Sequence, residues 1–308
     1  MLEKQKRQSR YVRPTEEQLG RIEIQPKDLD IIRLVYSYRF IRTDQLVALT
    51  PGDRSSLEKR LRKLWEHRFL ERYFLPVVNG REPLTRRAIY SLDYRGGNLL
   101  IKNDKADPSH IKHILRNNKP EYSYVEHQLM GGQFRATLSL ALAKSKKGRI
   151  LFWRQDKEIR DYVEIADRRG HKENLPIAPD GFFCLEDERG KMYWFLEIDR
   201  YTMSGPRWLD KMRAYYHWYD QKKYQEKFNI KNFRVLTVCP TAFQRDARLE
   251  ITKKVKINQV GSMQEAVGIN LFWFLSETDY TLDSPQSLLA QVFRVAKKDK
   301  ENGHHILE

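Results

Sequence analysis

The first third of the chain alternates apolar and polar residues with the period of an amphipathic helix. Apolar residues recur every three or four positions between Leu29 and Trp65, a spacing that places them on one helical face. The clearest stripe consists of Leu57, Leu61, Leu64 and Trp65. The pattern predicts three consecutive helices, which begin near Asp28, Thr43 and Arg54.

A hairpin is predicted directly after the third helix. Its two apolar runs, 70–78 and 86–92, flank Asn79-Gly80, a dipeptide typical of hairpin turns. Three helices followed by a hairpin form the plan of a winged helix-turn-helix, whose third helix enters the major groove of DNA. The residues that we expect to contact DNA are Arg42, Arg54, Ser55, Ser56, Lys59, Arg62, Lys63, Arg81 and Arg86. A basic helix that binds nothing, or a winged helix that contacts protein, would show the same pattern.

A second series of elements follows residue 122. Its apolar runs predict the order α-β-β-β-α-β-α-β, which is typical of an α/β domain with a mixed sheet. The predicted helices cover 124–144, 206–227 and 243–254. The predicted strands cover 150–153, 177–185, 191–199, 233–239 and 271–275.

The strand hairpin of this domain carries the candidate chemistry. The run 191–199 is apolar on both faces, as in a strand covered on both sides, yet it contains Glu197 and Asp199. A period of two residues places these carboxylates on the same face of the strand. If the hairpin folds about its polar centre, Asp180 comes opposite Glu197. Crowded carboxylates repel one another unless a cation neutralises them, and such oxygen clusters hold Mg²⁺ or Mn²⁺. The alternative is that acids at a strand end are solvated or paired with a nearby Lys or Arg.

Composition and charge predict a class of binding partner and a cellular compartment. The 308 residues carry a formal net charge of +16, which favours a polyanion such as nucleic acid over a membrane. No apolar run approaches the ~18 residues that span a bilayer, and the first ten residues lack the apolar core of a secretory signal. The two cysteines, Cys184 and Cys239, lie in apolar runs, so we expect reduced core residues and a cytoplasmic protein.

These features divide the chain into five predicted segments. They are a basic flexible arm (1–25), a winged helix-turn-helix domain (26–100), a linker (101–122), an α/β domain (123–280), and a C-terminal helix and tail (281–308).

Four sequence segments resemble the replication-relaxation family. They are the helical region 28–72, Ala178-Pro179-Asp180-Gly181 with Phe195-Leu196-Glu197-Ile198-Asp199-Arg200, and Lys211 through Tyr216. The resemblance implies a winged helix-turn-helix followed by a PD-(D/E)XK restriction-endonuclease-like domain, as in relaxase-type proteins of mobilisable plasmids. The similarity covers most of residues 26–240, and the combination of the two domains carries it rather than any single motif.

The resemblance also implies site residues. Asp180, Glu197 and Asp199 correspond to the metal-binding and catalytic acids, with Glu126 as an additional acid on the first helix of the nuclease-like domain. The general nuclease pattern has Lys two residues after the Glu, where this sequence has Asp199. Lys211, on the following helix, and Arg200 are the candidates for that role.

Two functions remain open from the sequence. The first is a metal-dependent DNA-nicking, relaxase-like enzyme of plasmid or mobile-element replication and mobilisation, with Mg²⁺ or Mn²⁺ as its cofactor. The second is a non-catalytic DNA-binding replication or transcription factor that keeps an inactive nuclease-like scaffold. The expected partner is double-stranded DNA at an origin-type site, and further candidates are a second copy of the chain and replication or transfer proteins. Water and a tyrosine are both candidate nucleophiles; the tyrosines considered are Tyr162, Tyr201, Tyr215 and Tyr216.

Overall fold

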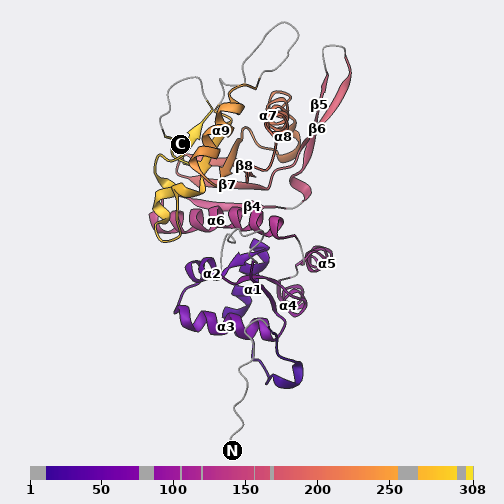
Figure 1. The fold of residues 1–308 in the computed structure, drawn as a ribbon, viewed down its shortest axis with the longest axis vertical. Helices are drawn as coiled ribbons and strands as arrows, with labels where there is room; N and C mark the ends of the chain where they lie inside the picture. Colours follow the sequence, from indigo (N-terminus) through magenta and orange to yellow (C-terminus); the bar gives the residue numbers. More distant parts are fainter. Residues whose placement is uncertain are drawn as a thin grey trace, which may run out of the picture. The chain divides into compact units, whose positions relative to one another are not determined.

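Helices and strands of the chain fall into two units, Met1–Gly132 and Gln133–Glu308 (Figure 1). The computed structural model describes residues 12–75, 87–104, 106–118, 121–155, 157–166, 170–255, 270–296 and 303–307. The boundary between the units lies within a long helix, α6 (Tyr122–Ser145), which agrees with the helix predicted over 124–144.

The first unit combines helices with a small antiparallel sheet. In chain order its main elements are α1 (Pro26–Tyr38), β1 (Ile41–Arg42), α2 (Thr43–Leu49), α3 (Arg54–Glu66), β2 (Leu70–Tyr73), β3 (Ile89–Leu92), α4 (Tyr94–Asp104) and α5 (Pro108–Arg116). The strands pair in the order β1-β3-β2, with both pairings antiparallel. The predicted turn Asn79-Gly80, with Arg81 and Arg86, lies outside the described residues.

The predicted third helix is confirmed, and its cap explains where it begins. The carboxylate of Asp53 accepts the backbone N–H of Ser56 at 2.7 Å, which satisfies a free donor of the first turn. The predicted apolar stripe is the buried face of α3: Leu57, Leu61, Leu64 and Trp65.

The start of the first helix differs from the prediction. Helix α1 begins at Pro26, whose fixed φ suits the first helical position, and Gln25 is its N-cap. Asp28 is the third helical residue, and its carboxylate accepts the backbone N–H of Gln25 at 2.7 Å. The same carboxylate is fully buried and paired with Arg60 of α3, so it joins the two helices.

The second unit is built on a six-stranded mixed sheet. Its strands are β4 (Arg149–Arg154), β7 (Gly181–Asp187), β8 (Gly190–Ile198), β9 (Arg234–Cys239), β10 (Phe272–Ser276) and β11 (Arg294–Val295). They lie in the order β11-β10-β9-β8-β7-β4. Strands β8, β9 and β10 are parallel to one another, and the other pairings are antiparallel. After β8 the chain forms the helices α7 (Gly205–Asp220), α8 (Lys223–Phe228) and α9 (Ala242–Thr252).

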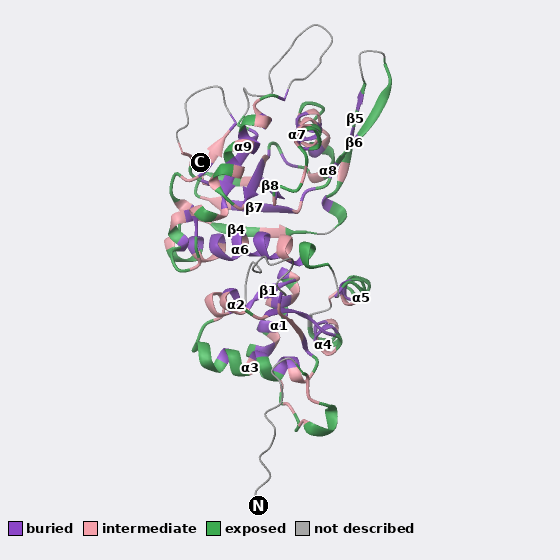
Figure 2. Ribbon diagram, viewed as in Figure 1, coloured by how far each residue is buried: buried purple, intermediate pink, exposed green. Residues whose placement is uncertain are grey.

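Helices cover both faces of the sheet around the central strand β8, as the two-sided apolar pattern of that strand predicts (Figures 1 and 2). On one face, Phe195 of β8 packs against Tyr215 and Trp218 of α7. On the other face, Phe183 of β7 packs against Phe134 of α6. The last five residues of β8 are therefore buried, including Glu197.

Parts of the second unit depart from the prediction. The helix expected over 206–227 is two helices, α7 and α8, because Lys222 adopts a left-handed backbone with φ of 57°. A two-stranded hairpin, β5 (Asp161–Ala166) with β6 (Lys172–Ile177), extends from the sheet and has no counterpart in the prediction. Its strands are too polar and exposed to give an apolar run.

The two ends of the chain also differ from the expected arm and helix. Arg13, within the predicted flexible arm, pairs with Glu71 and Asp93 at 3.0 and 2.9 Å and is thereby fixed to the sheet of the first unit. In the described part of 281–308, the chain forms a 3-10 turn (Pro285–Leu289) and β11 instead of an α-helix. Both cysteines are free and buried, as expected of core residues.

Candidate functional site

The carboxyl end of β8 brings an acid, a lysine and a tyrosine into direct contact. The Glu197 side chain is 1% exposed, and one of its carboxylate oxygens accepts a hydrogen bond from the Lys211 ammonium group. The other oxygen accepts the hydroxyl of Tyr215 at 2.5 Å. Lys211 and Tyr215 are four residues apart on α7, so both reach the strand from one face of that helix. Lys211, one of the two residues that the sequence offers for the role of the motif lysine, is thus in contact with Glu197.

Asp180 lies beside this cluster, in the predicted register. Gly181 pairs with Leu196, which places Asp180 opposite Glu197 across the two strands. The Asp180 carboxylate accepts the backbone N–H of Ile198 at 2.8 Å. Its charge acts on both members of the buried ion pair.

Burial sets the protonation of the cluster. Desolvation raises the pKa of Glu197 to about 7. The positive charge of Lys211 lowers this pKa, and the negative charge of Asp180 raises it. Desolvation also opposes the charge on Lys211, but the carboxylates of Glu197 and Asp180 outweigh it and raise the lysine pKa. Burial and the neighbouring Glu197 raise the pKa of Tyr215 well above its usual value. Glu197 is thus the group of this cluster that titrates near neutral pH.

Asp199 has a different partner. Its carboxylate accepts hydrogen bonds from the guanidinium of Arg248 on α9, and both side chains are at least nine-tenths buried. Arg248 also donates to the carbonyl of Met203 at 2.6 Å and packs on the rings of Tyr201 and Trp208. Asp199 therefore fixes α9 to the end of β8.

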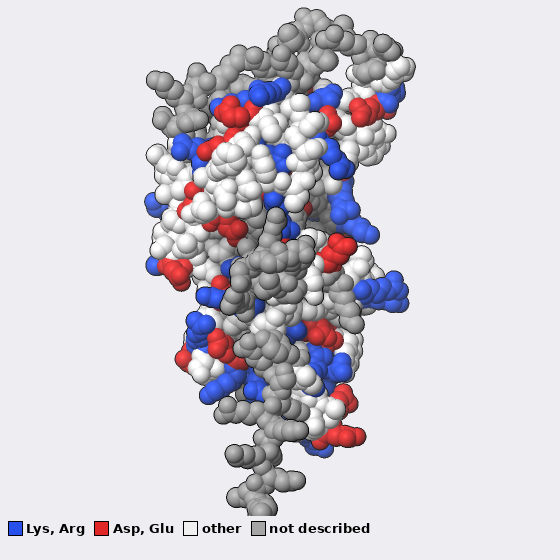
Figure 3. All heavy atoms as spheres, in the orientation of Figure 1, with Lys and Arg blue, Asp and Glu red and all other residues white. Residues whose placement is uncertain are grey.

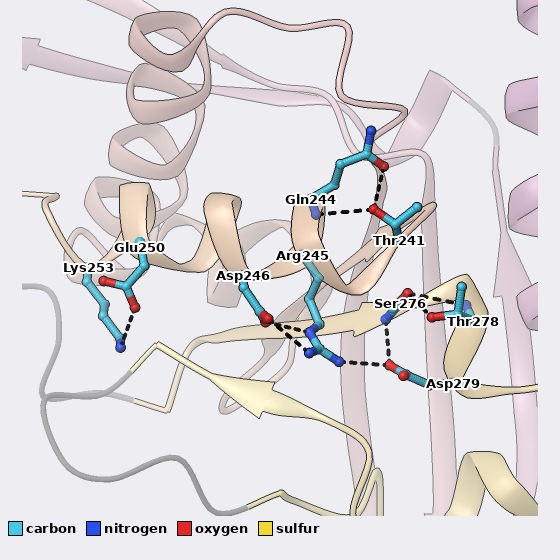
Figure 4. A network of polar contacts seen from close by, with 9 residues as sticks. All are labelled: Thr241, Gln244, Arg245, Asp246, Glu250, Lys253, Ser276, Thr278 and Asp279. Carbon is cyan, nitrogen blue, oxygen red and sulfur yellow. Dashed lines mark hydrogen bonds and ion pairs between the residues drawn. The ribbon is translucent and has the colours of Figure 1, made fainter.

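A second polar network continues along the same end of the sheet (Figure 4). Arg245 lies one helical turn before Arg248 on α9 and bridges Asp246 and Asp279 at 2.8 and 3.0 Å. Asp279 in turn accepts the backbone N–H of Ser276 at the end of β10. These contacts hold the beginning of α9 against the strand ends.

The two further predicted site residues, Arg200 and Glu126, belong to different units of the chain. Arg200 directly follows Asp199 beyond the end of β8 and is half-buried. Glu126 belongs to the first unit, whereas the other candidate acids belong to the second. Within the described ranges, no group of three or more His, Cys, Asp or Glu side chains is arranged to hold a metal ion.

The sequence pattern did not predict the contacts of two residues of this site. Tyr215 is predicted only as one of four candidate tyrosine nucleophiles, although its spacing of four from Lys211 on a predicted helix indicates a shared face. Arg248 gave no local signal, because its partner Asp199 is 49 residues away in the sequence.

The predicted DNA-binding residues of the first unit fall into three groups. The exposed face of α3 carries Arg54, Ser55, Ser56, Lys59, Arg62 and Lys63, as expected. Arg54 and Arg62 each pair with a glutamate one turn later, at 2.9 and 2.7 Å. Arg42 is instead buried and paired with Asp44 at 3.0 Å, and Arg81 and Arg86 lie outside the described residues. Basic and acidic side chains are interspersed on the visible surface (Figure 3).

The described part of the chain has no helix with both the length and the apolar character needed to cross a membrane.

Comparison with known proteins gives one assignment. Neither the curated proteins nor the solved structures contain a match to this chain. The family model described as replication-relaxation matches residues 32–234, well over half of the sequence. The match runs from α1 through the Glu197 cluster to the start of β9 and associates the chain with replication or mobilisation. The chain belongs to the replication-relaxation family.

Proposed function

We propose that this protein binds DNA through its first unit and nicks one DNA strand at a metal-dependent centre in its second unit. The nicking would take place at an origin-type site during replication or mobilisation of a plasmid or mobile element. The observation that carries the proposal is the contact of Lys211 with Glu197 at a strand end, opposite Asp180. The general nuclease pattern has a lysine two residues after the Glu, where this chain has Asp199. In this proposal Lys211, on the next helix, takes the role of that lysine.

The element order of the first unit supports the DNA-binding half of the proposal. Helices α1, α2 and α3 are followed by β2 and β3, and β1 completes an antiparallel sheet in the order β1-β3-β2. This order fits the winged helix-turn-helix that we propose for the first unit, in which α3 would enter the major groove. The exposed basic and hydroxyl side chains of α3 suit base edges and phosphates.

The side chains around Glu197 fit a divalent cation held by two acids rather than three. Asp180 and Glu197 supply carboxylate oxygens at opposed positions of adjacent strands, the ligand type that Mg²⁺ and Mn²⁺ prefer. Asp199 does not fit as a third ligand, because its partner Arg248 is buried together with it, whereas Lys211, the partner of Glu197, reaches the surface. A bound cation would polarise the scissile phosphate and stabilise the charge that develops on it.

Lys211 supplies the second positive charge of the proposed centre. Its side chain is 21% exposed beside a Glu197 that is almost fully buried, so it reaches both the acid and the surface. From there the ammonium group can donate to a phosphate oxygen, where a fixed charge in a low-dielectric site stabilises a transition state strongly.

Cation affinity is expected to fall as the pH is lowered, because Glu197 is then protonated. With Glu197 ionised, Asp180, Glu197 and Lys211 together carry one negative charge; with Glu197 protonated they carry none. Because the Glu197 pKa is raised to about 7, apparent cation affinity should fall about tenfold per pH unit below 7. At a cation concentration about 100-fold above Kd, Mn²⁺ should raise the melting temperature at pH 8 by roughly 5 °C or more.

The matched variants for this measurement are Asp180→Asn, which removes a proposed ligand, and Glu173→Asn on the exposed strand β6, which leaves the centre intact. We expect the Mn²⁺ shift to disappear in the first and to persist in the second. An equal shift in both variants, or a larger shift at pH 6 than at pH 8, would place the cation elsewhere.

DNA binding is expected to depend on the exposed face of α3. Replacing Lys59 and Arg62 together by Ala should weaken binding to origin DNA and lower the slope of log affinity against log salt by about 2. The control is Lys112→Ala with Arg116→Ala on α5, which removes the same charge from another exposed helix face. Fluorescence anisotropy across a salt series gives both quantities. Equal slopes for the two double variants would mean that α3 is not the DNA-binding helix.

One observation favours the second candidate function, a non-catalytic DNA-binding factor. Both oxygens of Glu197 already accept hydrogen bonds, and Asp199 is neutralised by Arg248, so the core is satisfied internally without a metal. A protein that binds origin DNA with the expected salt dependence, yet shows no Mn²⁺ shift and no nicking, would have this function.

A further inference from the structure

Tyr201 stands out at the end of the central strand. It follows Asp199 by two residues, it is 39% exposed, and its backbone is left-handed with φ of 62°. Most exposed aromatic residues of the described chain lie in ordinary helix or strand conformations; Tyr162, for example, lies in the extended strand β5. A non-glycine residue in the left-handed region costs about 1–2 kcal/mol, so the surrounding contacts must impose this conformation.

Those contacts come from the buried Asp199–Arg248 pair. The backbone N–H of Tyr201 donates to the Asp199 carboxylate at 3.0 Å. The Arg248 guanidinium carbon lies 4.6 Å from the centre of the Tyr201 ring. Because Arg248 is itself held by Asp199 and by the Met203 carbonyl, it offers the ring a fixed support. One side of the ring is thus supported from within the protein, while Tyr201 as a whole residue is exposed to solvent.

We propose that Tyr201 is a stacking platform for an unpaired base of the DNA strand at the cleavage site. The inference rests on the proposed function, because it is the position beside the Glu197 cluster that makes DNA the ligand. Tyr201 is four residues beyond Glu197, and its backbone is bonded to Asp199 at the same strand end, so a nucleotide on its ring would belong to the strand that enters the proposed centre. A base inside a duplex has both faces covered by its neighbours, so a base on Tyr201 must be unpaired and unstacked.

The geometry favours the ring of Tyr201 over its hydroxyl as the functional group. A rigid aromatic ring backed by a guanidinium is the arrangement that binds single-stranded nucleic acid by stacking, at about 1–3 kcal/mol per base. Such stacking tolerates any base, so Tyr201 would hold the strand in place while sequence choice stays with the first unit.

The test uses the full-length protein in EDTA and a short single-stranded DNA with a fluorescent aminopurine at its centre. Stacking on Tyr201 should quench the aminopurine, and Tyr201→Ala should lower affinity roughly 5- to 100-fold with loss of quenching. Tyr201→Phe should bind and quench like the wild type, because it keeps the ring. Tyr162→Ala removes an exposed tyrosine from β5 of the same unit and should also behave like the wild type.

Two results would overturn the stacking role. Quenching and affinity unchanged in Tyr201→Ala would show that no base lies on the ring, and equal losses in Tyr201→Phe and Tyr201→Ala would assign the effect to the hydroxyl. Circular dichroism of each variant excludes loss of folding as the cause. Binding is measured without metal, so the absence of a base on Tyr201 would not affect the result of the nicking assay. Quenching by a protein that does not nick DNA would reject the proposed function but support the contact between Tyr201 and a base.

Discussion

Replacing Lys211 by Met is expected to lower metal-dependent nicking about 100- to 1,000-fold while DNA binding through the first unit persists. The loss has two physical causes. The ammonium group no longer stabilises charge on the phosphate, and Glu197 loses the partner that lowers its pKa. More of Glu197 is then protonated at neutral pH, so cation affinity falls as well. Plasmid nicking measured from pH 7 to pH 9 separates the two causes, because raising the pH restores only the ionisation of Glu197.

Two variants control this experiment. Lys211→Arg keeps a positive charge beside Glu197 and should retain cation binding, and Lys191→Met removes an exposed lysine from the other end of β8. We expect Lys191→Met to nick at the wild-type rate. Full activity of Lys211→Met would remove Lys211 from the centre and leave Arg200 as the remaining candidate for its role.

Replacing Arg248 by Met is expected to destabilise the second unit by about 3–5 kcal/mol. The substitution leaves the Asp199 carboxylate buried without its partner, and a buried unpaired charge is among the costliest defects a core can hold. The free energy of unfolding is measured by urea titration followed by tryptophan fluorescence.

A surface ion pair at the C-terminal end of α9 provides the contrast (Figure 4). Lys253→Met breaks the contact with Glu250, which is at the surface and should contribute less than about 1 kcal/mol. Adding Asp199→Asn to Arg248→Met removes the stranded charge and should recover part of the lost stability. Equal costs for Arg248→Met and Lys253→Met would mean that the Asp199–Arg248 pair does not hold α9 to the strand.

Local pattern predicted the helices and strands of the central site well. The apolar stripe of α3, the two-sided burial of β8 and the position of Asp180 opposite Glu197 all follow from residue periodicity and one polar turn. These features are local, because the period of a strand or helix determines which side chains share a face.

What the sequence did not predict depends on contacts between distant segments. The three acids have similar local surroundings in the sequence, yet in the structure Glu197 pairs with Lys211 and Asp199 with Arg248. The two pairs form only when α7 and α9 pack on the sheet, because α7 brings Lys211 to Glu197 and α9 brings Arg248 to Asp199. The hairpin β5–β6 was missed for the opposite reason, since its exposed polar strands produce no apolar signal.

The most direct test of the metal-dependent centre is the nicking of a supercoiled plasmid that carries the protein's native origin. Wild-type protein with Mn²⁺ or Mg²⁺ is predicted to convert the plasmid to the open-circular form. Glu197→Gln, which keeps a hydrogen-bonding side chain but cannot ionise, should bind the same DNA and leave it supercoiled. Relaxation by both proteins, or by neither despite salt-sensitive binding, would contradict a catalytic centre at Glu197.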